Sequence, residues 1–257
     1  MLTPPEIARS LLAAGESKAR LPFGKMLLLA ILAGAYIALA GVGATAAAVT
    51  VESGSLAKLL SACVFPAGLS MVILAGSELF TGNCLMVMAL LERRITPAQL
   101  LRNWLTVYLG NAVGGAAVAA LAVYSHTASL FGDGLARSMV SIAESKAALG
   151  AGDAFLRGVL CNFLVCLAVW MAAASKHAEG KVIALFFPIL LFVLCGYEHC
   201  IANLYYLPAG AFAAAEYGME TTLTLAGCLE NLAAVTLGNL VGGAALGVGY
   251  RFAYLKE

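Results

Sequence analysis

Charged residues are scarce in this chain. Only 11% of its 257 residues are Asp, Glu, Lys or Arg, whereas a soluble domain averages about 25%. Hydrophobic residues make up 62% of the sequence, and the mean hydropathy is +0.92. So little charge excludes an ordinary soluble domain, and the composition indicates an integral membrane protein.

Several motifs that would indicate particular chemistry are also missing. The chain has no phosphate-binding glycine loop, so nucleotide binding is not expected. Its seven cysteines form no CxxC pair and fall in or beside apolar segments, which favours small buried thiols over disulfides. No His, Cys and carboxylate cluster has the spacing of a metal site. We therefore expect no metal, no cofactor and no nucleic-acid partner.

The chain does contain long stretches without any charged residue. A helix needs about 20 apolar residues to cross the ~30 Å hydrocarbon core. The stretches lack the ~10-residue alternation of a membrane β-barrel, so we expect helices. Four of them fit one span each: residues 26–51, 103–132, 158–175 and 231–250.

Two further apolar stretches, residues 59–91 and 182–215, are too long for one helix each. At ~1.5 Å per residue the first would be about 50 Å long, and tilt absorbs little of such an excess. Polar residues interrupt them at 77–83 and at 196–203. We therefore predict a half-helix, a loop and a second half-helix in each, which gives six spans with the second and fifth broken.

Each interruption holds a Glu that is followed five residues later by an Asn: Glu78 with Asn83, and Glu198 with Asn203. A carboxylate at membrane depth is costly unless the fold uses it. Paired broken helices in two halves of a chain indicate a solute site near the bilayer midplane. We expect these four side chains to hold the loops open by hydrogen bonds, away from the pore axis.

Thr81 and His199 are the candidate solute contacts in the two interruptions. His199 is the only histidine predicted deep in the membrane, and an imidazole can donate to an anion, carry a proton or be neutral. Loop N–H groups and helix N-termini also favour negative charge. The pattern therefore indicates a small anion as the solute.

An internal repeat relates the two halves of the chain. Residues 109–115 (LGNAVGG) and 237–243 (LGNLVGG) match at six of seven positions, 128 residues apart. The Glu and Asn pairs repeat at a spacing of 120. Three spans per half is an odd number, so the halves, about 23–125 and 153–255, are predicted to have inverted topology. The glycines allow close helix contact, and the repeated Asn can add interhelical hydrogen bonds.

Residues 1–22 form a separate feature before the six-span channel domain, residues 23–257. The segment Thr-Pro-Pro-Glu at residues 3–6 has the capping-box pattern, and Ile7, Leu11 and Leu12 make an apolar stripe. We expect a short amphipathic helix at the cytoplasmic surface, either an anchor or a gate.

Lys and Arg are distributed unequally between the two predicted sides. Eleven, Lys256 among them, fall on one side, and only Lys58, Arg137, Lys146 and Arg157 fall on the other. This asymmetry predicts a multi-pass protein of the plasma (inner) membrane with both termini in the cytoplasm. The first apolar run is too long for a cleavable signal peptide, so none is expected.

The interruptions resemble those of the formate/nitrite transporter family. The resemblance rests on residues 78–83 (ELFTGN) and 197–208 (YEHCIANLYYLP), together with 161–171 in the fourth span and 235–239 in the sixth. It extends from about residue 5 to 255. It implies an aquaporin-like protomer with an inverted repeat, embedded in membrane lipid as a homopentamer with one pore per subunit. It also implies small monovalent anions as substrates: formate, nitrite or hydrosulfide, and lactate or acetate in some members.

The resemblance further implies roles for individual residues. Lys146 would draw anions into the outer vestibule, and Asn162 would hydrogen-bond His199 or the solute. A proton supplied at or near His199, by the imidazole or by water, would let the neutral acid cross. The substrate pore would comprise Thr81, His199, Asn162 and Asn239, the outer constriction Phe65, Phe80 and Val165, and the inner constriction Leu69, Leu79 and Phe192.

Two other classes of function compete with anion transport. A neutral-solute channel of the water or glycerol kind would carry paired Asn-Pro-Ala half-helices, and the sequence has none. A membrane enzyme using His199 and a cysteine would need a base with an orienting partner, which the pattern does not provide. We therefore expect a non-enzymatic anion channel, with the neutral-solute channel as the alternative.

Overall fold

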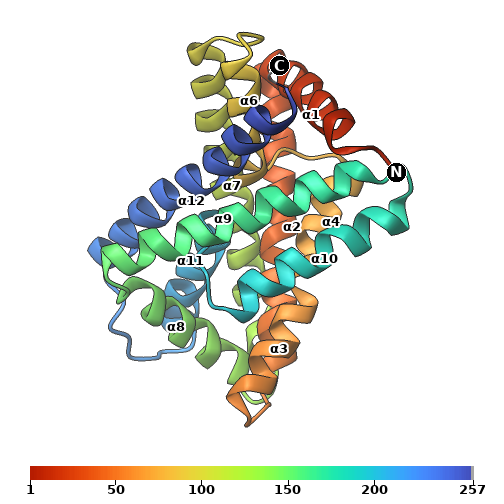
Figure 1. The fold of residues 1–257 in the computed structure, drawn as a ribbon. Helices are drawn as coiled ribbons and strands as arrows, with labels where there is room; N and C mark the ends of the chain where they lie inside the picture. The colour runs from red at the N-terminus through yellow and green to blue at the C-terminus, as the bar shows by residue number, and fades with distance from the viewer. Residues whose placement is uncertain (256–257) are drawn as a thin grey trace.

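The computed structural model describes residues 1–255, and every regular element in that range is a helix (Figure 1). Lys256, one of the eleven cations counted toward the cytoplasmic side, lies outside the described residues. Five stretches are helical, long and apolar enough to cross a membrane, which confirms the all-α membrane class. They are α2 (Phe23–Ala48), Gly54–Ala75, α7 (Pro97–Tyr124), α9 (Ala151–Ala174) and α12 (Leu225–Tyr254).

The first predicted interruption lies in the chain that follows α2. Helix α3 (Gly54–Val64) continues into α4 (Pro66–Ala75), which ends at Gly76 with a φ of 79°. The chain becomes helical again as α5 (Phe80–Asn83), η1 (Cys84–Met86) and α6 (Val87–Leu91). A left-handed residue ends a helix at little cost when it is glycine.

The second interruption has the same form. Helix α10 (Ala178–Leu194) ends just before Gly196, whose φ is 68°, and α11 (Cys200–Glu216) begins after His199. Both non-helical segments are shorter than the predicted 77–83 and 196–203, since their last residues already form a helical turn. A helix provides hydrogen-bond partners for its own backbone N–H and C=O groups, and apolar surroundings provide none.

Two shorter amphipathic helices complete the fold: α1 (Pro4–Ala19) and α8 (Gly134–Ala147), the latter preceded by η2 (Thr127–Ser129). The predicted start of α1 is present, because the Glu6 carboxylate accepts hydrogen bonds from both Thr3 N and Thr3 Oγ1. Figure 1 shows α1 at the end of the molecule that also holds the C-terminus, whereas α3 and α8 lie at the opposite end.

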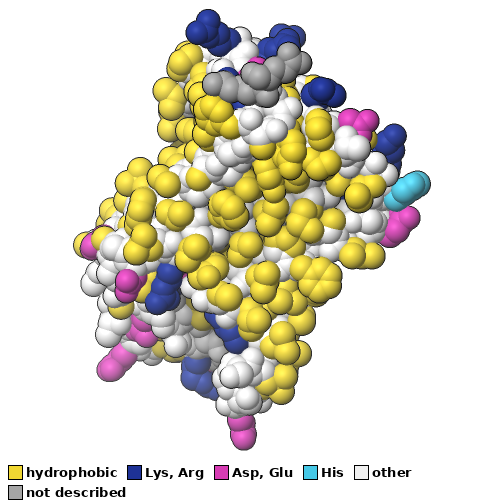
Figure 2. Space-filling model, in the orientation of Figure 1, with side chains coloured by type: hydrophobic (Ala, Val, Ile, Leu, Met, Phe, Trp, Pro, Cys, Tyr) yellow, Lys and Arg dark blue, Asp and Glu magenta, His cyan; other side chains and the backbone are white. Residues whose placement is uncertain are grey.

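Hydrophobic side chains cover the middle of the molecule. Figure 2 shows them over the centre of the visible face, with charged side chains gathered toward the two ends. Many large apolar residues are exposed, Leu105 by 65% and Leu121 by 69%. A continuous apolar surface of this kind would be a liability in water and is the normal outer surface of a protein in lipid.

Glycines of the LGNxVGG repeat bring pairs of long helices into close contact. A Cβ at Gly114 in α7 would collide with the Ile31 carbonyl oxygen of α2, and one at Gly242 in α12 with the Val159 carbonyl oxygen of α9. These are equivalent positions in the two halves. The repeat therefore sets the same helix pairing twice, as its glycines predict.

Replacing Gly242 by alanine tests this pairing. The new methyl would meet backbone that cannot move aside cheaply, so Gly242→Ala should lower the free energy of unfolding by about 1–3 kcal/mol. Gly249→Ala, in the same helix but with nothing within 4 Å of the added carbon, is the matched control. The measurement is the temperature at which the detergent-solubilised protein loses its size-exclusion peak, and equal values for the two variants would contradict the prediction.

Candidate functional site

Thr81 and His199, predicted as a central pair, are brought together from opposite halves of the chain. Thr81 Oγ1 lies 2.9 Å from His199 Nε2. Thr81 is in the first turn of α5, and His199 is the residue that caps the start of α11. Both are buried, so the contact lies inside the protein where α5 and α11 begin.

The hydrogen bonds of His199 define which nitrogen carries its proton. The backbone N–H of Ala202 donates to His199 Nδ1 over 3.1 Å, so Nδ1 is the acceptor nitrogen. In a neutral imidazole the hydrogen is then on Nε2 and is donated to Thr81 Oγ1. Within residues 1–255 the Thr81 hydroxyl hydrogen has no acceptor of its own. This hydrogen is therefore an unused donor on a fully buried side chain.

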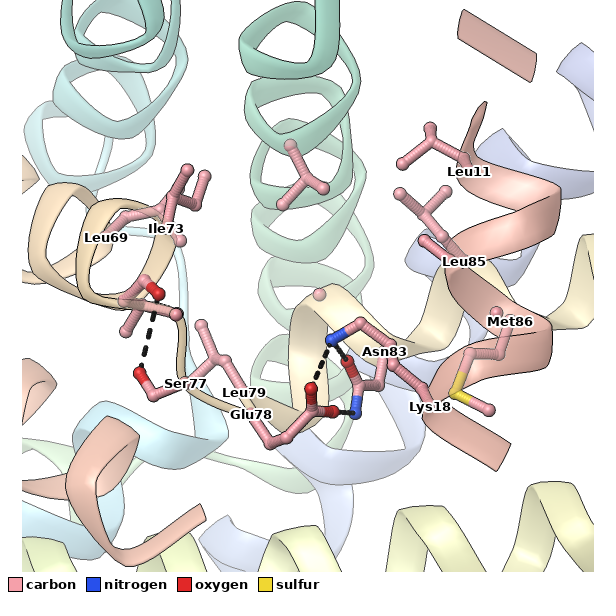
Figure 3. A pocket seen from close by; sticks show the side chains of 16 residues that line it. Leu11, Lys18, Leu69, Ile73, Ser77, Glu78, Leu79, Asn83, Leu85 and Met86 are labelled. Carbon is pink, nitrogen blue, oxygen red and sulfur yellow. Dashed lines mark hydrogen bonds and ion pairs between the residues drawn. The ribbon is translucent and has the colours of Figure 1, made fainter. Parts of the chain in front are cut away.

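The first loop is held by a cluster that we call the Lys18 clasp: Lys18, Glu78, Asn83 and Asn103. Figure 3 shows the first three of these side chains. Lys18 Nζ donates to Glu78 Oε1 and Asn83 Oδ1, each over 2.8 Å. Asn83 Nδ2 donates to Glu78 Oε2 over 2.7 Å and to Asn103 Oδ1 over 2.9 Å. The buried carboxylate thus has both a cation and an amide as partners, which offsets its desolvation.

The second loop is held by an equivalent Lys146 clasp: Lys146, Glu198, Asn203 and Asn231. Lys146 Nζ lies 2.9 and 3.0 Å from the two carboxylate oxygens of Glu198. Asn203 Nδ2 donates to Glu198 Oε2 over 2.7 Å and to Asn231 Oδ1 over 2.8 Å. Lys146 was predicted to attract anions, and here it also neutralises the carboxylate of the loop.

Lys18, Asn103 and Asn231 are members of these clasps that our sequence analysis missed. A signal for them exists in the sequence. The tetrapeptide Glu-Ser-Lys-Ala occurs at residues 16–19 and again at 144–147, 128 residues apart, which is the spacing of the LGNxVGG motif. Both copies end an amphipathic helix, α1 or α8. The correspondence between the halves therefore reaches in front of the predicted boundaries at 23 and 153.

Asn111 and Asn239, the repeated asparagines of α7 and α12, hydrogen-bond the backbone of the two loops. Asn239 accepts from Cys200 N over 2.9 Å and donates to the Gly158 and Glu198 carbonyl oxygens over 2.8 and 2.9 Å. Asn111 makes the same three bonds in the first half. The interhelical bonds expected of these asparagines are thus present. Both Asn239 amide hydrogens are donated to backbone carbonyls.

Asn162 supports the Thr81 loop. Its Nδ2 donates to the Thr81 carbonyl oxygen over 3.2 Å and to the Asn239 carbonyl oxygen over 2.7 Å. Among residues 1–255 it makes no hydrogen bond to His199, so that contact expected from the sequence is absent. Its amide instead fixes the backbone that positions the Thr81 hydroxyl.

Two cavities lie near the Thr81–His199 contact, although Thr81 itself borders neither of them. The Lys18 cavity, about 330 Å³, is bordered by Lys18, Glu78 and Asn83 of the Lys18 clasp and by Leu69 and Leu79. The Lys146 cavity, about 370 Å³, is bordered by Lys146, Glu198 and His199. Each cavity is thus bordered by the lysine and the glutamate of the clasp from one half of the chain.

The predicted constriction residues are distributed differently from the expectation. Phe192, expected with Leu69 and Leu79, borders the Lys146 cavity together with Phe65, with ring centroids 5.6 Å apart. Its ring also stacks on His199 at 5.8 Å. Phe80 and Val165 are buried but border neither cavity, and Phe80 packs against the rings of Trp104 and Tyr108.

Comparison with known proteins relates the chain to one family throughout its length. A model of the formate/nitrite transporter family matches residues 5–253. The chain is 38% identical to a probable formate transporter of Methanothermobacter thermautotrophicus, over 99% of this chain and 98% of that one. It is 39% identical to the formate channel FocA of Haemophilus influenzae, over 86% and 84%.

Two solved structures are similar to the fold. One is an FNT family ion channel, with a TM-score of 0.86, 32% identity, and coverage of 96% of this chain and 98% of that one. The other is a pentameric formate channel with formate bound, with a TM-score of 0.80, 33% identity, and coverage of 91% and 98%.

Asn239→Leu tests the fastening role of this side chain. The substitution leaves the amide of Cys200 without its acceptor and removes a donor from the carbonyls of Gly158 and Glu198. Each such buried group costs about 1–3 kcal/mol, so a marked loss of thermal stability is expected. Val241→Ala, at an exposed position of the same helix, is the control. If Asn239→Leu unfolds at the same temperature as Val241→Ala but transports poorly, the result would show instead that the Asn239 amide contacts the solute.

Proposed function

Because the chain belongs to the formate/nitrite transporter family, we propose that it passes formate, nitrite or hydrosulfide through a pore between the Lys18 and Lys146 cavities. It is a multi-pass membrane protein of a family of anion channels and transporters, not an enzyme. The observation that carries the proposal is the buried Thr81–His199 contact, with its unused hydroxyl donor, next to the Lys146 cavity that His199 borders.

The anion would be drawn toward Lys146 and lose water as it reaches the rings of Phe65 and Phe192. A bare charge is strongly disfavoured in such an apolar passage. The Thr81 hydroxyl supplies a hydrogen bond there, since its oxygen already accepts from His199 Nε2. A donor that is itself hydrogen-bonded in this way is polarised and binds an anion more strongly. Leu69 and Leu79 would form the apolar passage on the far side.

A proton from the solution on the side of the anion, relayed by water in the cavity and not taken from His199, would neutralise the anion. His199 Nδ1 already accepts the Ala202 N–H, so an imidazolium would set two N–H groups against each other. The imidazole therefore stays neutral and acts as a hydrogen-bond donor. Weak acids suit this pathway because each has an accessible neutral form that crosses the apolar rings at lower cost.

The assembly and orientation follow the same line of reasoning. We infer six crossings, the second and fifth interrupted, with both termini in the cytoplasm of a plasma (inner) membrane. One similar solved structure is a pentamer, and we extend that state to this chain as a homopentamer with one pore per subunit. No observation favours the alternative of a water or glycerol channel.

Thr81→Val tests the hydroxyl donor directly. Valine has a similar shape but lacks the hydroxyl, and a hydrogen bond to an anion is worth about 1.5–3 kcal/mol. Formate uptake into liposomes should therefore fall by about 10- to 100-fold. Thr81→Ser keeps the hydroxyl and should retain most of the uptake. Equal uptake by the two variants would show that the hydroxyl does not contact the anion.

The source of the proton is tested by the pH dependence of a His199 variant. If water donates, the residual uptake of His199→Gln should still rise as the pH on the side of the formate falls, because more anion is neutralised. The native protein serves as the reference for the slope. If uptake by His199→Gln does not change with pH over the same range, the result would show that His199 donates the proton.

A further inference from the structure

All four cations predicted for the side opposite the cytoplasm gather around one opening. Lys58, Lys146 and Arg157 border the Lys146 cavity. Arg137 borders a neighbouring cavity of about 560 Å³ that shares Thr45, Ser61 and Ser141 with it. The four side chains thus lie around two adjoining hollows instead of being spread over the membrane surface.

Negative charge does not balance these cations. Glu198 is the only carboxylate that borders the Lys146 cavity, and its oxygens are already held by Lys146 and Asn203. Within residues 1–255, Lys58 and Arg157 form no ion pair. Within residues 1–255 the Lys18 cavity differs, because its charged lining residues are Lys18 and Glu78, which pair with each other. Of these two cavities, the Lys146 cavity is therefore the one with excess positive charge.

The lining of the Lys146 cavity suits an oxyanion with more than one charge. A guanidinium such as that of Arg157 can bind two oxygens of one phosphate, while an ammonium such as that of Lys58 acts as a point charge. The Ser141 hydroxyl at the rim makes no hydrogen bond within the described residues, so it is free to donate. An anion with two charges is attracted about twice as strongly to the same cations as a monovalent anion at the same distances.

The inner end of the same cavity would stop such an anion. Phe65 and Phe192 are each 4% exposed, and their rings are in edge contact. A second charge makes the passage through an apolar ring much more costly. A phosphate-like anion would therefore be held in the cavity without being transported.

We propose that the Lys146 cavity is also a binding site for polyvalent oxyanions of the phosphate class, which occlude the pore from that side only. The binding site rests on the charges described above, and its inhibitory effect rests on the proposed function. Two sources share this chemistry: a free phosphate or diphosphate, and the phosphomonoester headgroup of phosphatidic acid.

The test measures formate uptake by the protein in liposomes of zwitterionic lipid, with inorganic pyrophosphate added on one side at constant ionic strength. Pyrophosphate outside should block only those molecules whose Lys146 cavity faces outward, and pyrophosphate on both sides should block all of them. The double variant Lys58→Gln/Arg157→Gln should need at least about tenfold more pyrophosphate for half-inhibition, relative to its own uninhibited uptake. Lys176→Gln, at an exposed position of the other end, is the control and should not shift the value.

The outcomes separate the binding site from the transport function. Native uptake that pyrophosphate does not inhibit, or a double variant inhibited like the native protein, overturns the proposal. Lower uptake in liposomes that contain phosphatidic acid, measured without pyrophosphate and restored in the double variant, supports the site with lipid as its ligand. If native protein takes up no formate, the proposed function fails. Binding at the site is then tested by the phosphorus resonance of pyrophosphate. Broadening by purified native protein but not by the double variant supports the site, and equal broadening by both overturns it.

Discussion

Unpaired peptide groups cannot remain exposed to hydrocarbon, and the rest of this structure depends on how the two interruptions meet that constraint. Asn111 and Asn239 reach across from α7 and α12 and bond the backbone on both sides of each loop. The N–H groups of Glu78 and Glu198 donate to carbonyls of α2 and α9. With the backbone satisfied, α5 and α11 can begin inside the protein and present Thr81 and His199 to each other.

The carboxylates impose a second constraint, because a buried charge needs a partner close by. Lys18 and Lys146 come from the last turns of α1 and α8, two helices outside the apolar spans. Each helix therefore contributes to a loop far from it in sequence, beyond any role at the membrane surface. The cations also differ in surroundings, since Lys146 shares its cavity with Lys58 and Arg157 whereas Lys18 has no such neighbours.

Sequence periodicity and composition were sufficient for the helical class, the positions of the interruptions and the repeated Asn111 and Asn239. They could not give the partner of Glu78, because a lysine in an amphipathic helix normally faces water and Lys18 lies sixty residues away. Phe192 was assigned to the wrong group of neighbours for a related reason. An apolar helix gives no periodic signal for its rotation. The packing of α10 against α9, α3 and α4 orients that ring toward Phe65 and His199.

The residues of each clasp all come from the same half of the chain as the loop that they hold. Lys18, Glu78, Asn83, Asn103 and Asn111 all precede residue 125, and their counterparts in the second half all follow residue 133. The Thr81–His199 contact, in contrast, joins the two halves. Each half thus supplies the partners of its own loop carboxylate, while Asn162 of the second half adds a bond to the Thr81 carbonyl of the first. The same self-sufficiency is what a half-length ancestral chain would have needed in order to pair with an inverted copy of itself.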